Sequence, residues 1–356
     1  MAKFKLKDFA KDISVAIKDA QSSPLKRFVG LEHYDSGEPV ITRFTDTSLI
    51  SSAVKEFKEN DILIARRNVY LRRAGIAFFS GLTSGDSIIL RIYDDCEEKT
   101  GIPKEDAIKI LPFILNSNDF WNYANKHADG MNSKRISKDM LYDYEFDLPS
   151  LTEQRVIADK LWAAYRLKES YKKLLAATDE MVKSRFIEMF GNLKQDTPWS
   201  EVVTITNGKA YPEEYQDEGT YPICGSGGIM YYGEKKLCNG NTIILGRKGN
   251  INSPIFMESD YWIVDTAFSL DVYKEKLNPR FFYFWCCQYD FTKLNKQGVL
   301  PSLTRKDLEK VEMAVPPMGQ QKQFVSIAEQ ADKSKFELRK SIKTIDIVIK
   351  SLINKK

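Results

Sequence analysis

The fold is decided by a segment that occurs twice, as Leu148-Pro149-Ser150-Leu151-Thr152-Glu153-Gln154-Arg155 and as Val315-Pro316-Pro317-Met318-Gly319-Gln320-Gln321-Lys322. From position 148 to position 315 the offset is 167 residues. In each copy a proline lies directly before a long mixed run, which is typical of a helix start. Two further segments repeat upstream in the same order, Asp61–Arg66 with Thr242–Arg247 and Lys138–Met140 with Lys306–Leu308. This layout predicts two copies of one unit, each a mixed domain followed by a helix.

The long run after each segment carries a heptad seam. In the second copy the seam positions alternate in steps of four and three, at Phe324, Ala328, Ala331, Lys335, Leu338, Ile342, Ile345, Ile349 and Leu352. In the first copy they lie at Ile157, Leu161, Ala164, Lys168, Tyr171, Leu175, Thr178, Val182 and Arg185. A narrow apolar stripe needs a partner helix. We therefore expect two long antiparallel coiled-coil helices, and the alternative is that each helix covers the sheet of its own domain.

Both seams contain a lysine at the same position, Lys168 and Lys335. A lysine within a seam costs stability but can specify the register of two helices. The alternative is that both side chains snorkel at the rim of the seam.

The parts outside the helices read as two α+β domains. Strands are expected at 62–65, 75–79 and 87–92, and again at 242–245, 254–257 and 267–272. A helix is expected at 103–126, and Asn278 followed by Pro279 predicts another helix start. The fold class is thus α+β, with two mixed α/β domains separated by the helices. The expected segments are residues 1–147, 148–191, 192–315 and 316–356.

The composition restricts the classes of function. The chain has 356 residues, of which 43% are hydrophobic and 29% charged, as in ordinary two-domain globular proteins. It has no run of 18 apolar residues and no apolar region near the N-terminus, so we expect a cytoplasmic protein that does not bind membranes. Five cysteines without a Cys-x-x-Cys pair favour reduced thiols. Two histidines are too few for a histidine metal cluster or a serine-hydrolase triad.

The basic residues are segregated even though the net charge is only +4. No acidic residue lies between Asp61 and Asp86, nor between Glu234 and Glu258. Both windows include the end of a matching strand, and Arg, Lys and Asn contact phosphates and purine edges. We therefore predict nucleic-acid contacts in both windows, with a solvated positive loop as the alternative. The candidates are Arg66, Arg67, Asn68, Tyr70, Arg72 and Arg73 in the first window, and Arg247, Lys248 and Asn250 in the second.

A second polar, basic loop also repeats, as residues 131–138 and 299–306. Its candidates are Lys134 and Arg135 in the first copy, and Ser302, Thr304, Arg305 and Lys306 in the second. Helix capping by Ser or Thr is the alternative interpretation. A glycine-rich turn at 225–228 adds Ser226 and Tyr231 as candidates, but it lacks the Gly-Lys-Ser/Thr of a phosphate loop.

Signatures of enzymes are missing from the sequence. It has no Walker A motif, and Asn278-Pro279-Arg280-Phe281 lacks the second proline of the motif found in amino-methylating enzymes. Nuclease-like Glu-x-Lys triplets lack a Pro-Asp partner. The residues therefore indicate a binding protein without an active site of its own.

At this level the chain resembles the DNA specificity subunit of type I restriction–modification systems. The two repeated Pro-containing segments are similar to that family's junction between recognition domain and long helix. Three further segments resemble its recognition domain, Gly246–Ile251, Tyr261–Ala267 and Pro301–Leu308. The first domain has Ala65-Arg66-Arg67-Asn68 where the second has Gly246-Arg247-Lys248-Gly249, in which glycines flank the two basic residues.

The resemblance implies that two target recognition domains each read one half of a bipartite double-stranded DNA site, with the helices as a spacer. It also implies that the helices dock two adenine methyltransferase subunits, which bind S-adenosylmethionine, while this chain binds no cofactor or metal and is not an enzyme. Two motor–nuclease subunits can join such a complex. The alternatives are a helical interaction scaffold or decoy that binds acidic protein partners, and a stand-alone methyltransferase or nuclease.

Overall fold

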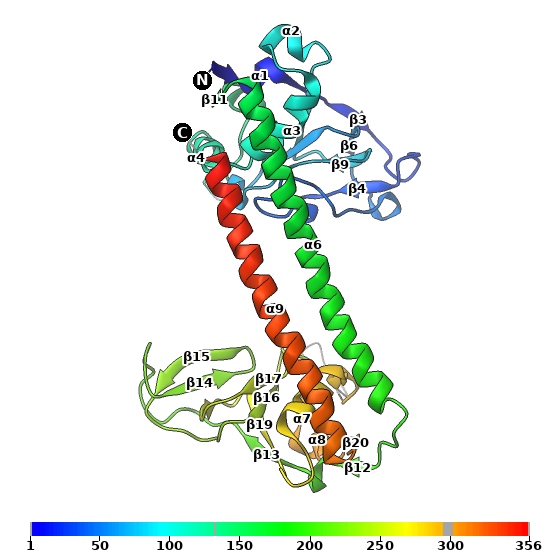
Figure 1. The fold of residues 1–356 in the computed structure, drawn as a ribbon, viewed down its shortest axis with the longest axis vertical. Helices are drawn as coiled ribbons and strands as arrows, with labels where there is room; N and C mark the ends of the chain where they lie inside the picture. The colour runs from blue at the N-terminus through cyan, green and yellow to red at the C-terminus, as the bar shows by residue number, and fades with distance from the viewer. Residues whose placement is uncertain (1, 132, 295–301, 355–356) are drawn as a thin grey trace. The chain divides into compact units, whose positions relative to one another are not determined.

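The structure is a computed structural model that describes residues 2–131, 133–294 and 302–354. The chain forms two compact units, the first made of residues 1–172 with 340–356 and the second of residues 173–339. Each unit thus combines one mixed domain with a part of each of the two long helices, α6 (Leu151–Phe190) and α9 (Met318–Ile353) (Figure 1). No helix among the described residues has the length and apolar character needed to cross a membrane.

The described residues of the first unit form three sheets. Their strands are β1 (Ala2–Lys5) paired with β11 (Glu145–Leu148); β2 (Ala10–Asp12), β10 (Ser87–Ile92), β7 (Ile62–Ala65) and β8 (Ala74–Ile76) in that order; and β3 (Val15–Ile17), β6 (Val54–Phe57), β9 (Gly81–Ser84), β4 (Arg27–Val29) and β5 (Thr45–Asp46) in that order. The short helices are α1 (Leu6–Phe9), α2 (Cys96–Thr100) and α5 (Lys138–Tyr142).

Strand β7 is buried on both faces. Ile62 and Ile64 belong to the core shared with the helices, whereas Leu63 and Ala65 belong to a second cluster with Phe57. Alternate side chains of a strand point to opposite faces, so a continuous apolar run fits a strand enclosed between two layers.

The expected helix at 103–126 is two helices, α3 (Lys104–Ile114) and α4 (Asn118–Lys126). The prediction of one helix was wrong because Ser117 starts a new helix. The Ser117 hydroxyl accepts a hydrogen bond from the Phe120 N–H at 3.1 Å, as an N-cap does.

The second unit repeats the arrangement of the first. Its strands are β12 (Thr197–Pro198) paired with β20 (Glu312–Met313); β13 (Val203–Asn207), β19 (Ala267–Val272), β16 (Thr242–Gly246) and β17 (Ile255–Met257) in that order; and β15 (Gly228–Gly233), β14 (Tyr221–Gly225) and β18 (Trp262–Ile263) in that order. Its short helices are α7 (Pro279–Gln288), capped by Asn278 as predicted, and α8 (Arg305–Leu308). The strand orders β2-β10-β7-β8 and β13-β19-β16-β17 correspond, which confirms the duplication.

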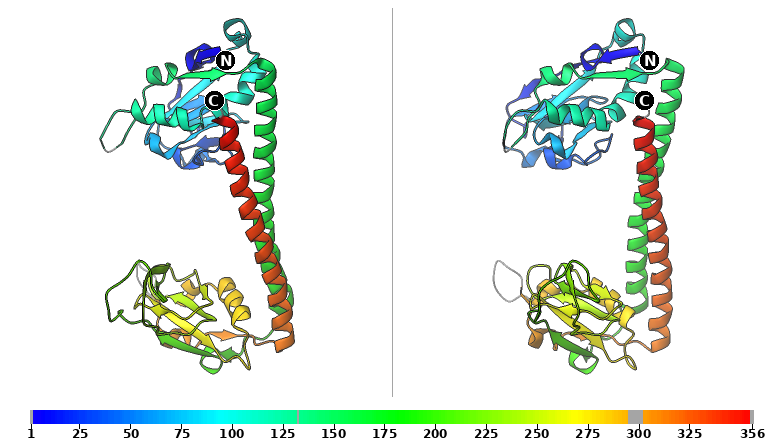
Figure 2. Two further views of the ribbon diagram at one scale, coloured as in Figure 1. Left: turned by 60° about the vertical axis from the view of Figure 1, so that its left-hand side comes forward. Right: turned by 90° about the vertical axis from the view of Figure 1, so that its left-hand side faces the viewer.

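In each unit α6 and α9 lie side by side and run antiparallel (Figure 2). In the first unit Leu161 lines a cavity with Leu352, and further along α6 Lys168 contacts Asp346. In the second unit Asp179 contacts Lys335, and the ring of Phe186 lies 5.2 Å from that of Phe324. The predicted antiparallel pairing is therefore confirmed.

The helices also belong to the domain cores, as the alternative interpretation proposed. Ala158, Leu161 and Tyr165 of α6 are buried in the core of the first domain. Phe324 and Ala328 of α9 are buried in the core of the second. Each long helix thus serves both its own domain and the other helix.

The predicted seam of α6 changes at its C-terminal end. Arg185 forms an ion pair with Glu188 at 2.7 Å, and Phe186 and Phe190 occupy the core instead. Arg185 was wrongly placed in the seam because aromatic side chains one residue later provide the apolar surface that Phe324 packs against.

The two seam lysines each pair with an aspartate on the opposite helix. Lys168 Nζ lies 2.6 Å from Asp346 Oδ1, and Lys335 Nζ lies 2.8 Å from Asp179 Oδ1. The lysine side chains retain only 10% and 14% of their exposure, so they are directed into the helix pair rather than snorkelling. Burial lowers the pKa of Lys335, but its bonds to Asp179 and Asp332 outweigh that effect and raise the pKa.

We predict that Lys335 and Asp179 are energetically coupled. In a double-mutant cycle of Lys335→Met and Asp179→Ala, urea unfolding should give a coupling free energy of about 1 kcal/mol, because the ion pair between the helices exists only when both residues are present. Asp332 stays beside Lys335 in the Asp179→Ala variant. In the control cycle Glu180→Ala, which removes an exposed neighbouring side chain, takes the place of Asp179→Ala. The coupling free energy of this cycle should be near zero. Equal coupling in the two cycles would show that the pair has no specific role.

Candidate nucleic-acid interface

In the first domain the two predicted basic loops meet. The Arg66 carbonyl accepts the Ile136 N–H at 3.0 Å, and the Asn68 N–H donates to the Lys134 carbonyl at 2.7 Å. Arg67 and Arg135 pair as an isolated β-bridge. Loops that lie far apart in the sequence therefore form one surface.

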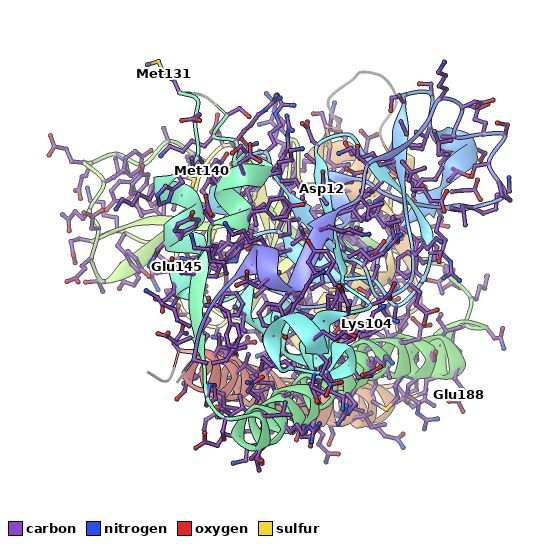
Figure 3. All side chains as sticks on the ribbon, turned by 90° about the horizontal axis from the view of Figure 1, so that it is seen from above. Asp12, Lys104, Met131, Met140, Glu145 and Glu188 are labelled. Carbon is purple, nitrogen blue, oxygen red and sulfur yellow. The ribbon has the colours of Figure 1, made fainter. Side chains whose placement is uncertain are left out.

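Side-chain contacts connect the two loops of the first domain further. Arg67 Nε donates to Ser133 Oγ at 3.0 Å, and Ser133 Oγ donates to Asn68 Oδ1 at 3.1 Å. Lys134 and Arg135 are exposed. Nearby, the almost fully exposed Met131 points away from the rest of the domain (Figure 3). The loop thus offers positive charge and hydrogen-bond donors to a ligand outside.

The second domain repeats this junction. The Arg247 carbonyl accepts the Leu303 N–H at 2.9 Å, and Lys248 pairs with Ser302 as an isolated β-bridge. Arg66 therefore corresponds to Arg247, as the repeated strand predicted.

The match of 131–138 with 299–306 is one residue out of register, because Ile136 corresponds to Leu303. Ser137 and Thr304, which follow these residues, are both helix N-caps. Asn132 and residues 299–301 of these loops lie outside the described residues.

The glycine-rich turn of the second domain lies beside the Arg247 loop. A Cβ atom at Gly246 would lie 2.2 Å from the Asn250 carbonyl oxygen, so the loop needs glycine to return so closely. The Ser226 N–H donates to Thr266 Oγ1 at 3.3 Å. The structure thus brings Ser226 to the same place as Arg247, while exposed Tyr231 stacks on Tyr215 with ring centroids 4.8 Å apart.

The charges of the two junctions differ. In the first domain Asp86 lies 3.7 Å from Arg66 Nε and 3.6 Å from Arg67 Nη1. In the second domain, within the part of the chain that the structure describes, the exposed side chains of Arg247 and Lys248 form no ion pair or hydrogen bond. Asn250 and Lys306 are likewise exposed. Arg247 and Lys248 thus lack the carboxylate that faces Arg66 and Arg67.

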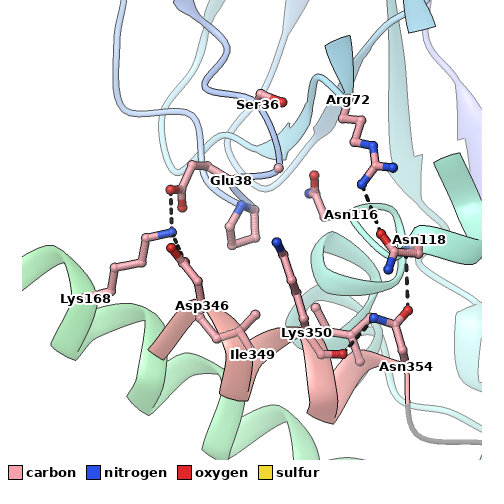
Figure 4. Close-up of a pocket in the computed structure, with 13 residues that line it drawn as sticks. Ser36, Glu38, Arg72, Asn116, Asn118, Lys168, Asp346, Ile349, Lys350 and Asn354 are labelled. Carbon is pink, nitrogen blue, oxygen red and sulfur yellow. Dashed lines mark hydrogen bonds and ion pairs between the residues drawn. The ribbon is translucent and has the colours of Figure 1, made fainter. Parts of the chain in front are cut away.

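Arg72 points to a different place from Arg67. Its Nη1 donates to Asn118 Oδ1 at 3.0 Å, and it lines a cavity of about 260 Å³ together with Lys168, Asp346 and Lys350 (Figure 4). Tyr70 is 58% exposed. The six candidates of the first window therefore do not form one surface, because a short helical turn at 69–71 directs Arg72 toward the long helices.

Arg73 supports the loop from within. Its Nη1 donates to the Leu31 carbonyl at 3.0 Å and its Nη2 to the Arg67 carbonyl at 2.9 Å. Burial lowers the pKa of Arg73. A guanidinium that satisfies two backbone carbonyls is placed to hold the loop rather than to contact a ligand.

In the second domain capping accounts for Thr304, as the alternative interpretation proposed. Thr304 Oγ1 accepts the Asp307 N–H at 3.2 Å and donates to Asp307 Oδ2 at 2.7 Å. Arg305 pairs with Glu309 at 2.7 Å. DNA contacts by these two residues stay predictions.

Sequence reasoning missed several residues at the junctions. Asp86 was recognised only as the border of an acid-free window, and Thr266 only as part of a family segment. Lys55 lies close to Arg66 and Asp86, donates to the Ser87 carbonyl at 2.9 Å, and has its pKa lowered chiefly by burial. No local pattern indicated Lys55 because only the pairing of β6 with β9 brings it there.

We predict that Arg73→Ala destabilises the first domain by about 1–3 kcal/mol, because two carbonyls lose their donor. Arg67→Ala, at an exposed neighbouring site, should change the free energy of unfolding by less than about 0.5 kcal/mol. Urea denaturation of both variants measures the difference. Equal values would contradict the supporting role of Arg73.

Among the residues described, no group of three or more His, Cys, Asp or Glu side chains could hold a metal ion. The arrangement of the junctions is that of a binding surface, with cations and amide groups presented from paired loops.

Comparisons with known proteins fit this surface. Residues 195–345 match the family model of the type I restriction modification DNA specificity domain. The chain is similar to the S subunit of a type I restriction–modification system from M. genitalium, with 14% identity, a TM-score of 0.61, and coverage of 99% of this chain and 94% of that one. A structure from a study of complex assembly and conformational transition in a type I R-M system has 16% identity, a TM-score of 0.58, and coverage of 99% and 96%. No curated protein matches.

The two structural likenesses concern the fold of the whole chain, and the family model concerns the domain that carries Arg247 and Lys248. Residues 195–345 therefore match the type I restriction modification DNA specificity domain, and the chain as a whole has a fold similar to that of the S subunit from M. genitalium.

Proposed function

We propose that this chain is the DNA-recognition subunit of a type I restriction–modification assembly and that each mixed domain binds one part of a two-part DNA target. The observation that carries the proposal is the repeated junction of basic loops. Arg66 and Arg247 lie at matching strand ends, and each carbonyl accepts the N–H that precedes a helix cap, from Ile136 and Leu303. Two matching cationic surfaces suit two DNA segments.

The residue types at these junctions suit DNA. Lysine and arginine neutralise phosphates, and this term supplies most of the non-specific affinity. An arginine can also bind guanine O6 and N7 together, which discriminates the base pair. Arg247, whose side chain has no partner among the described residues, is the leading candidate for such a contact.

The long helices provide surfaces for partner subunits. In the second unit α6 exposes Leu174, Met181 and Ile187 at 49%, 48% and 54%. The spacing of seven residues places Leu174 and Met181 on one side of the helix, where a partner helix could cover them, whereas Ile187 is turned by about 120° from Met181. We assign this role to methyltransferase subunits, which would carry S-adenosylmethionine, and the assembly could add motor–nuclease subunits. No catalytic step is assigned to this chain.

Replacing Arg247 tests the DNA contact. Arg247→Ala should weaken binding of the target duplex by about 1–3 kcal/mol, and the methylation pattern of cells should relax at one position of the site. Fluorescence anisotropy and sequencing of methylated DNA measure the two effects. Lys322→Ala, which removes an exposed cation on α9, is the control and should leave both unchanged. Normal binding and methylation by Arg247→Ala would refute the assignment.

The helices are predicted to set the spacing between the two parts of the target. Deleting one heptad from each helix, residues 171–177 and 338–344, keeps the seam in phase and removes about 10 Å of helix. The preferred spacer in methylated sites should therefore change. The control is a variant that carries the substitutions Glu180→Ala and Lys340→Ala and has no deletion. An unchanged spacer preference would exclude this role of the helices.

A second candidate function is binding of an acidic protein partner without DNA. It is favoured by exposed apolar side chains on β15, where Ile229, Met230 and Tyr231 are 53%, 46% and 43% exposed. Measuring the binding constant K at several salt concentrations separates the two functions. For DNA, log K falls linearly with log salt, and the slope becomes steeper with each phosphate that is neutralised.

A further inference from the structure

We infer that Asp86 weakens the attraction of the first recognition domain for DNA phosphates, an effect that has no counterpart at the equivalent position of the second domain. The inference rests on the proposed DNA-binding function. It assigns to Asp86 the role of offsetting part of the positive charge that its own loop presents to DNA.

The inference begins with two residues at equivalent positions. The Arg66 N–H donates to the Asp86 carbonyl at 3.0 Å, and the Arg247 N–H donates to the Thr266 carbonyl at 2.8 Å. Asp86 directly precedes β10, and Thr266 directly precedes β19. Strand β10 pairs with β7, which ends just before Arg66, and β19 pairs with β16, which ends just before Arg247. Asp86 and Thr266 are therefore structural counterparts, one charged and one neutral.

Asp86 is placed to offset the positive charge of its loop. Its two carboxylate oxygens lie 3.7 Å from Arg66 Nε and 3.6 Å from Arg67 Nη1. These distances exceed those of hydrogen bonds, so the carboxylate compensates the charge of the arginines without locking their geometry. Its side chain remains 25% exposed, so a phosphate that approaches the arginines also meets this negative charge.

Thr266 has no such effect in the second domain. Its hydroxyl accepts the Ser226 N–H at 3.3 Å and joins the glycine-rich turn to the Arg247 loop. The neighbouring Asp265 is exposed and forms no ion pair with Arg247 or Lys248 in the described part of the chain. Both cations therefore remain available to phosphates.

The other charged groups near Asp86 do not cancel its effect. Lys55 is partly buried and donates to the Ser87 carbonyl. Burial lowers the pKa of Lys55, and the nearby carboxylate of Asp12 opposes that lowering. Lys55 and Asp12 thus offset each other behind the loop. The paired loops differ as well, since Lys134 and Arg135 are exposed cations in the first domain, whereas Ser302, the counterpart of Arg135, is uncharged. The charge at position 86 is therefore one difference among several, and its effect concerns the first domain.

The consequence concerns the salt dependence of DNA binding. Each phosphate that a protein neutralises contributes about −0.9 to the slope of log K against log salt. Because Asp86 offsets about one cation, the first domain gains less from sequence-independent attraction. Removing the charge of Asp86 should therefore strengthen sequence-independent binding by the first domain.

The test exchanges the two counterparts in the full chain. Asp86→Asn keeps the shape and removes the charge, and Thr266→Asp adds a charge while its side chain can still accept the Ser226 N–H. Binding to a duplex without a target site is measured by fluorescence anisotropy from 50 to 200 mM NaCl. Asp86→Asn should bind about three- to tenfold more tightly at the lowest salt, with a slope steeper by about 0.9, and Thr266→Asp should show the opposite changes.

Asp86→Glu, which retains the charge, is the matched control and should bind like the unchanged protein. Weaker binding of Asp86→Asn at every salt concentration would overturn the inference, since Asp86 would then position the arginines. An unchanged slope in both Asp86→Asn and Thr266→Asp would overturn it as well. If Asp86→Asn does not fold, Thr266→Asp decides alone. Absence of salt-dependent DNA binding by the unchanged protein would instead refute the proposed function.

Discussion

The structure depends on the pairing of two long helices whose seams each include a lysine. A buried ammonium group is unfavourable unless a carboxylate lies beside it, and Lys168 and Lys335 each find an aspartate on the opposite helix. Asp346 and Asp179 are themselves repeat counterparts, 167 residues apart. Within each unit this lysine–aspartate ion pair forms in one register of the antiparallel helices, so it favours that register over the others.

Polar contacts also attach each mixed domain to the long helices. In the first unit Glu38 lies 2.6 Å from Lys168 Nζ, so a loop of the domain joins the ion pair of the helices. In the second unit Gln321 is fully buried, and its side chain bonds the N–H of Asn278 and the carbonyls of Lys276 and Pro316. The two copies therefore share a layout but attach their domains through different polar contacts.

The same divergence marks the candidate DNA surface. Duplication preserved the backbone junction at Arg66 and Arg247, because it depends on strand pairing and on a helix cap. The side chains around it have changed, with Asp86 in one copy and Thr266 in the other. Two domains of one fold can in this way present different electrostatic surfaces to DNA, as expected when binding sites occupy loops on a common scaffold.

The sequence by itself determined the duplication, the helices with their seams, the central strands and the acid-free windows, because heptad and strand periodicities are local patterns. Only the tertiary structure decided which basic residues share a surface. It joined Arg67 with Arg135, turned Arg72 toward the helices, and used Arg73 for two backbone carbonyls. It also brought Asp86 to the arginines. These outcomes depend on contacts between residues distant in sequence, where the position of a carbonyl or carboxylate follows from strand pairing and no local pattern specifies it.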